Sequence, residues 1–208
     1  MRQFRHHAFT LIELLIVVAI IAILAAIAVP NFLEAQVRSK VSRVKNDMRT
    51  LATAIEAYKV DTNRYPPDYR PDRQLLWSYL PRLQVLTTPV AFLTAIPEDV
   101  FAEAAISRNS VLAGPYKVPY GTTLVRPYTF DYAYRIYYTG VPEATATWEK
   151  ITSNPESVLW ALRSVGPDLE ASVLGDPNVQ VYDPTNGTLS KGDIFYTGPG
   201  KGFDQPKR

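Results

Sequence analysis

A nearly unbroken apolar run with one carboxylate near its start constrains this chain more than any other feature. Between residues 9 and 29 only Thr10 and Glu13 are not hydrophobic. A helix rises about 1.5 Å per residue, so the run is about 30 Å long and matches the hydrocarbon thickness of a bilayer. A charge at the centre of such a span costs about 2.5–3.5 kcal/mol, and less near an end. Glu13 therefore predicts a positively charged partner.

An ordinary signal peptide is the first alternative for this run. It would have a shorter apolar core, no acid inside it, and a small-residue cleavage site at its far end. Here Arg2 and Arg5 lie just ahead of the acid-bearing segment. The positive-inside rule predicts that these arginines hold the N-terminus in the cytoplasm while the rest of the chain crosses the membrane. We therefore expect a single-pass membrane protein with an exported C-terminal domain.

The segment Ala8-Phe9-Thr10-Leu11-Ile12-Glu13 resembles the N-terminus of type IV pilins and of type II secretion pseudopilins, and is most similar to the major pseudopilin. Members of that family begin with a short basic leader, a small residue, Phe-Thr-Leu-Ile-Glu and an apolar helix. The resemblance implies that a prepilin peptidase cleaves between Ala8 and Phe9 and that the new Phe9 amine is methylated. It also implies that Glu13 faces the Phe9 amine of a neighbouring subunit. The family usually has Gly where this chain has Ala8.

The same resemblance implies a set of partners and a location. The partners are other pilin-like subunits in a homopolymer, prepilin peptidase, an inner-membrane assembly platform, and membrane lipid before assembly. The subunit would cross the inner membrane once, with its N-terminus in the cytoplasm and its C-terminal domain in the periplasm. The filament would lie in the periplasm or at the cell surface. A type IV pilin for adhesion, motility or DNA uptake is the alternative within this class. A membrane-anchored enzyme or binding domain is the alternative from another class.

The composition disfavours several functions. Cysteine is absent, and both histidines, His6 and His7, lie in the expected leader. A cleaved chain would lack thiol and imidazole, which excludes Cys-His and Ser-His-Asp catalysis and a zinc site, so we expect no enzyme. Without Arg2 and Arg5, 20 of the 22 Lys and Arg residues remain against 20 Asp and Glu. This balance gives no reason to expect nucleic acid as a partner.

An amphipathic pattern continues past Pro30. Apolar residues three and four apart form one stripe on a helix, at Val37, Val41, Val44, Met48, Leu51, Ile55 and Tyr58. The stripe predicts packing on the core of its own domain, and a coiled-coil seam between subunits is the alternative. We expect one helix over about residues 9–60, kinked or locally melted at Pro30. Asp61-Thr62-Asn63 and then Tyr65-Pro66-Pro67 should end it.

Four segments describe the predicted organisation. They are a leader (1–8), a transmembrane or filament-core helix (9–29), its amphipathic continuation (30–61), and a soluble domain (62–208). Within the soluble domain, apolar and aromatic patterns predict strands at 128–139, 157–165, 179–182 and 194–197, and short helices at 74–80 and 100–106. A long helix followed by short strands predicts an α+β, pilin-like fold, in which the helix packs on a small antiparallel sheet.

An oxygen-rich loop lies near the C-terminus. Ser164-Val165-Gly166-Pro167-Asp168 and Lys191-Gly192-Asp193-Ile194 resemble the Ser-x-Gly-x-Asp and Asp-Ile elements of major pseudopilins, whose intervening loop binds calcium. The resemblance implies Asp168 and Asp193 as calcium ligands. Asp183 and Asn186 are further candidates by chemistry alone, because calcium takes about six to eight oxygens. Simple turn formation by Asp and Asn side chains is the alternative. A glycosidase carboxylate pair is a more remote one.

Overall fold

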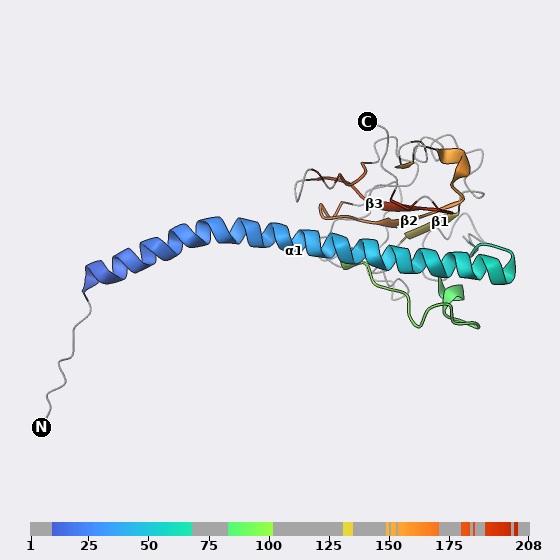
Figure 1. Cartoon of the computed structure of the whole chain (residues 1–208), viewed down its shortest axis with the longest axis horizontal. Coiled ribbons are helices and arrows are strands. Elements are labelled where there is room, and N and C mark those ends of the chain that lie inside the picture. Colours follow the sequence, from blue (N-terminus) through green and yellow to red (C-terminus); the bar gives the residue numbers. More distant parts are fainter. Residues whose placement is uncertain are drawn as a thin grey trace, which may run out of the picture.

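One helix, α1 (Leu11–Thr62), accounts for 52 residues of the chain. Thr10 caps its N-terminal end, and Asn63 ends it in the left-handed conformation with φ 56°, which Asn tolerates better than most residues. These bounds agree with the predicted helix to within about two residues at each end. The helix continues through Pro30, so local melting there is wrong, and Figure 1 shows a gradual curve.

The structure, a computed structural model, describes only part of the soluble domain in addition to this helix. The described residues are 10–67, 83–101, 131–134, 149, 151–152, 154–170, 180–183, 185, 190–200 and 202–203. The helix predicted at 74–80 lies outside them. Of the helix predicted at 100–106, only Val100 and Phe101 are described, and both are helical.

The first half of α1 is apolar and uncovered. Its large hydrophobic side chains from Leu11 to Leu33 are all exposed, and an 18-residue window has a mean hydropathy of 3.1 with none of it buried. By length and composition the helix could cross a membrane. Figure 1 shows this half projecting away from the sheet. An apolar surface of this size requires a cover from outside the subunit.

The second half of α1 packs on the domain. Val44, Met48, Leu51 and Ile55 are fully buried, and Val37 and Tyr58 are partly buried at the two ends of the stripe. The same core contains sheet residues, of which Trp160, Leu162 and Ile194 are the central ones. The predicted packing of the stripe on its own domain is therefore confirmed.

The sheet has three described strands, β1 (Asp131–Tyr134), β2 (Trp160–Ser164) and β3 (Ile194–Gly198), in the order β1-β2-β3 with both pairs antiparallel. Side chains of a strand alternate between the two faces. Trp160 and Leu162 of β2 therefore join the core under α1, whereas Ala161 joins a second cluster with Ile151, Val158 and Phe195. Figure 1 shows α1 running along one face of the sheet.

This arrangement confirms the α+β prediction, a long helix on a small antiparallel sheet. The strands predicted at 157–165 and 194–197 are present as β2 and β3, and β1 lies within the predicted 128–139. The strand predicted at 179–182 is not present as such. Val181 instead forms an isolated parallel bridge with Asp193.

A carboxylate near the end of α1 joins the helix to the sheet. The indole N–H of Trp160 donates to Glu56 Oε1 at 2.9 Å, although the two residues lie 104 positions apart in the chain. The hydroxyl of Tyr65 donates to Glu56 Oε2 at 3.2 Å. Both hydrogen bonds go to a charged acceptor, which makes them stronger than neutral ones. They connect the end of α1, the segment after it and β2.

Candidate functional site

The carboxylate in the apolar run lies at the N-terminus of α1, where its own helix binds it. The backbone N–H and the hydroxyl of Thr10 each donate to Glu13 Oε2 at 2.8 Å. In return, the Glu13 N–H donates to Thr10 Oγ1 at 3.3 Å. This reciprocal pattern is a capping box, which satisfies two amides that a helix start otherwise leaves unpaired. Within this chain, Glu13 is therefore bound by two neutral donors of Thr10 at the helix start.

Thr10 is a functional residue that the sequence analysis did not single out. The signal was present, because Thr-x-x-Glu ahead of an apolar run is the capping-box spacing. Ala8 and Phe9, where cleavage and methylation are predicted, lie outside the described residues. The pairing of Glu13 with the Phe9 amine of a neighbour stays a prediction.

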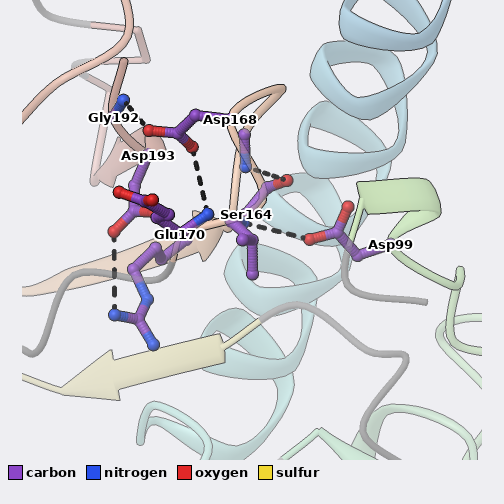
Figure 2. Close-up of polar contacts among 9 residues, drawn as sticks. Asp99, Ser164, Asp168, Glu170, Gly192 and Asp193 are labelled. Carbon is purple, nitrogen blue, oxygen red and sulfur yellow. Dashed lines mark hydrogen bonds and ion pairs between the residues drawn. The ribbon is translucent and has the colours of Figure 1, made fainter. Parts of the chain in front are cut away.

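The C-terminal loop is closed by a carboxylate that binds backbone amides (Figure 2). Asp168 Oδ2 accepts from the Gly192 N–H at 2.7 Å, and its Oδ1 accepts from the Glu170 N–H at 3.3 Å. The second contact, to the amide two residues on, is the hydrogen bond of an Asx-turn. The first spans 24 positions and joins the two ends of the loop.

Two glycines allow the ends of the loop to approach. Gly166 has φ +79°, and a Cβ there would lie 2.2 Å from the carbonyl oxygen of Gly192. Gly192 has φ +109°, and its Cβ would lie 2.4 Å from the carbonyl oxygen of Gln180. Both positions therefore require glycine, for conformation and for space.

Asp193, the second predicted ligand, is buried beside a cation of the protein itself. Its side chain is 0% exposed, and its Oδ2 lies 3.7 Å from Nη1 of Arg163, whose side chain is 10% exposed. In Figure 2 Asp168 lies beside Gly192, whose amide it binds, whereas Asp193 pairs with Arg163. Because charges are costly to bury, such pairs depend on each other for counter-charge. The structure thus brings Asp168 and Asp193 close together in space, because Asp168 binds the amide of Gly192, but the two carboxylates have different partners.

Asp99 is a further carboxylate that contacts the loop, and the sequence analysis missed it. It is 2% exposed, and its two oxygens accept from the N–H groups of Phe101 at 3.0 Å and Val165 at 3.3 Å. The bond to Phe101 follows from its position before Val100, because Asp commonly caps a helix start. The hydrogen bond from Val165 joins residues 66 positions apart, so no local pattern in the sequence could predict it.

The remaining predicted ligands lie further along the loop. Asp183 Oδ1 accepts from the N–H of Thr185 at 2.8 Å and from its hydroxyl at 2.7 Å, a second Asx-turn. Burial raises the pKa of the neighbouring Tyr182; Arg38 opposes this rise and Asp183 adds to it. Asn186 lies outside the described residues.

The described carboxylates do not converge on one point. Within the part of the chain that the structure describes, no three Asp, Glu, His or Cys side chains group so that they could hold a metal. The oxygens of Asp168 and Asp183 bind amides and a hydroxyl, and Asp193 faces a guanidinium. Because calcium takes about six to eight oxygens, these residues alone do not fit a complete site. Calcium binding therefore stays a prediction from the sequence.

Melting with and without calcium tests that prediction. A soluble fragment beginning at Pro30 should melt at a higher temperature with calcium than with chelator, because a ligand that binds only the folded state adds about 2.7 kcal/mol at a hundredfold excess over Kd. Asp168→Ala and Asp193→Ala should each abolish the difference. Both changes also remove contacts seen here, so the calcium dependence is the readout, and identical melting curves for the unmutated fragment would contradict calcium binding.

Comparison with known proteins confirms the resemblance at the N-terminus. A family profile described as "Prokaryotic N-terminal methylation motif" matches residues 3–29. The type IV major pilin protein PilA of Myxococcus xanthus is 54% identical over 61 residues, which are 29% of this chain and 28% of PilA. The type II secretion system core protein G of Pseudomonas aeruginosa is 39% identical over 66 residues, which are 32% of this chain and 46% of that protein.

A third relative is the type IV major fimbrial protein FimA of Dichelobacter nodosus, 57% identical over 53 residues, which are 26% of this chain and 34% of FimA. No solved structure matches the chain. The matched segment spans less than half the length of each of these three relatives. The N-terminal third of this chain is thus homologous to type IV pilins and to core protein G, with the methylation motif at its start.

Proposed function

We propose that the chain is a structural subunit of a pilus-like filament, specifically the major pseudopilin of a type II secretion system. In this proposal prepilin peptidase processes it, and its Phe9 amine is methylated. The observation that carries the proposal is α1 itself. Its first half is apolar and uncovered, it begins with a capped Thr10–Glu13 pair, and it matches the methylation motif. Such a helix is stable in lipid or against other such helices, but not in water.

A type IV pilin is the second candidate, and the comparisons give it specific support. The type IV major pilin PilA and the type IV major fimbrial protein FimA are 54% and 57% identical to this chain over its N-terminal segment, against 39% for core protein G of P. aeruginosa. We prefer the pseudopilin because of the segment that follows the helix. This segment, Asn63-Arg64-Tyr65-Pro66, resembles the corresponding segment of major pseudopilins. Deleting the gene separates the two candidates. Loss of protein export into the medium supports the pseudopilin, whereas loss of surface pili with normal export supports the pilin.

The proposal is for a structural protein rather than an enzyme. The three relatives are named as a pilin, a fimbrial protein and a secretion system core protein. The subunit would wait in the inner membrane with its N-terminus in the cytoplasm and its domain in the periplasm. It would then join a homopolymer with the help of an inner-membrane assembly platform.

Processing gives a direct test of this proposal. We expect mass spectrometry of the protein from membranes to show a chain that starts at Phe9 and carries one added methyl group on its N-terminal nitrogen. A strain without prepilin peptidase, as control, should yield the unprocessed leader. A chain that keeps residues 1–8 in a strain with active peptidase would contradict the proposal.

A further inference from the structure

Exposed basic side chains lie on the solvent side of α1 just beyond its apolar half. The last large apolar side chains of that half are Phe32 and Leu33, at 62% and 54% exposure. Arg38, Lys40 and Arg43 follow within ten residues, and all three are exposed. We call these three residues the basic collar. The apolar surface thus passes directly into a positively charged one along the same helix.

The helix geometry places the start of the basic collar, Arg38, at the depth of the lipid headgroups, and Arg43 beyond them. With about 1.5 Å of rise per residue, Arg38 lies about 8 Å and Arg43 about 15 Å past Leu33. The headgroup layer extends roughly 5–8 Å beyond the hydrocarbon on each side of a bilayer. Side chains of a helix lean toward its N-terminus, so the long Arg and Lys side chains point back toward that layer.

The collar is only partly neutralised by its own helix. Arg38 pairs with Glu34 and Arg43 with Asp47, but the arginine side chains remain 69% and 66% exposed. Exposed pairs of this kind are worth little and leave the guanidinium free to bind elsewhere. Lys40 makes no ion pair with the described residues.

We propose that the basic collar binds the phosphate groups of anionic phospholipids while the subunit waits in the membrane. This inference rests on the proposed function, in which the apolar half of α1 spans a bilayer. A lipid surface is the expected partner because the collar begins within two helical turns of this apolar half. Arg2 and Arg5 precede the span and the collar follows it, so basic residues flank both of its ends.

The test uses full-length protein in nanodiscs of equal parts phosphatidylglycerol and phosphatidylcholine. Native mass spectrometry then counts the lipids of each kind that stay bound. We expect phosphatidylglycerol to be enriched in the unmutated protein. Each basic residue near a membrane surface raises the affinity for anionic lipid by about fivefold. In the variant R38Q/K40Q/R43Q the ratio of bound phosphatidylglycerol to bound phosphatidylcholine should therefore fall by more than about tenfold. The matched control R49Q/R64Q/K191Q removes the same charge from exposed positions further from the span and should keep it.

A conservative variant separates charge from fold. R38K/R43K keeps the positive charge and should retain the enrichment, while circular dichroism should show the same helix content for all variants. Three outcomes would overturn the proposal: no enrichment in the unmutated protein, enrichment that persists in the collar variant, or an equal loss in the control. Filament assembly and Phe9 methylation of the unmutated protein are read separately, so absence of phosphatidylglycerol enrichment together with normal filaments refutes the collar alone. Enrichment without filaments or methylation refutes the proposed function alone.

Discussion

Replacing Glu13 with Ala should abolish filament assembly while the protein stays in the membrane at the same or a higher level. The change removes a costly charge from the apolar span, so insertion is expected to be intact or improved. It also leaves the Phe9 amine of the neighbouring subunit without its counter-charge inside a helix bundle. Breaking a buried pair costs about 3–5 kcal/mol, which is more than a hundredfold in an association constant. Sheared filaments and membrane fractions, quantified by immunoblot, measure the two effects.

The capping box provides the matched control for this prediction. Glu13→Ala removes both the carboxylate and the hydrogen bonds it accepts from Thr10. Thr10→Val keeps the carboxylate but removes the hydroxyl cap, which is worth about 1 kcal/mol. If the loss of assembly came from the cap alone, the two variants would behave alike. Filament yields equal to wild type for Glu13→Ala would refute the pairing.

Replacing Arg163 with Met should destabilise the soluble domain by about 3–5 kcal/mol, because it leaves Asp193 as a buried charge without its guanidinium. Asp193 is 0% exposed, so water cannot replace the lost partner without opening the loop. For a domain of this size the loss corresponds to a fall in Tm of roughly 10 °C or more. Thermal and urea unfolding of the fragment that begins at Pro30 measure it.

The double variant Arg163→Met/Asp193→Leu shows whether the loss of stability comes from removing one partner of the ion pair. Replacing a buried ion pair by apolar residues of similar size is often neutral or stabilising. We therefore expect the double variant to regain most of the stability that Arg163→Met loses. If the two single changes simply added, the ion pair would not be the cause. Lys191→Gln, an exposed charge in the same loop, should change the stability by less than about 0.5 kcal/mol.

Local patterns were sufficient to predict the long helix and two of the strands. The apolar stripe repeats every three to four residues, and Asn63 with the prolines that follow it ends the pattern, so the bounds of α1 came within two residues of the prediction. Strands β2 and β3 are short apolar runs between turn residues, and both lie where they were predicted. At 179–182 the apolar character is similar, but the structure has only the bridge between Val181 and Asp193. A strand forms only where another segment lies alongside to pair with its backbone, and the four residues 179–182 do not determine which segment that is.

The sequence by itself determined that an apolar helix with one acid near its N-terminus follows the basic segment and continues as an amphipathic helix. These features depend on residues within a few positions of each other, and helix periodicity relates such residues directly. Only the tertiary structure decided that Asp168 binds the amide of Gly192, that Asp193 faces Arg163, and that Asp99 holds Val165. Those contacts join residues 24, 30 and 66 positions apart in the chain. Such partners meet only after the strands have paired and the helix has packed, so the composition of the loop could suggest oxygen ligands without showing which groups those oxygens bind.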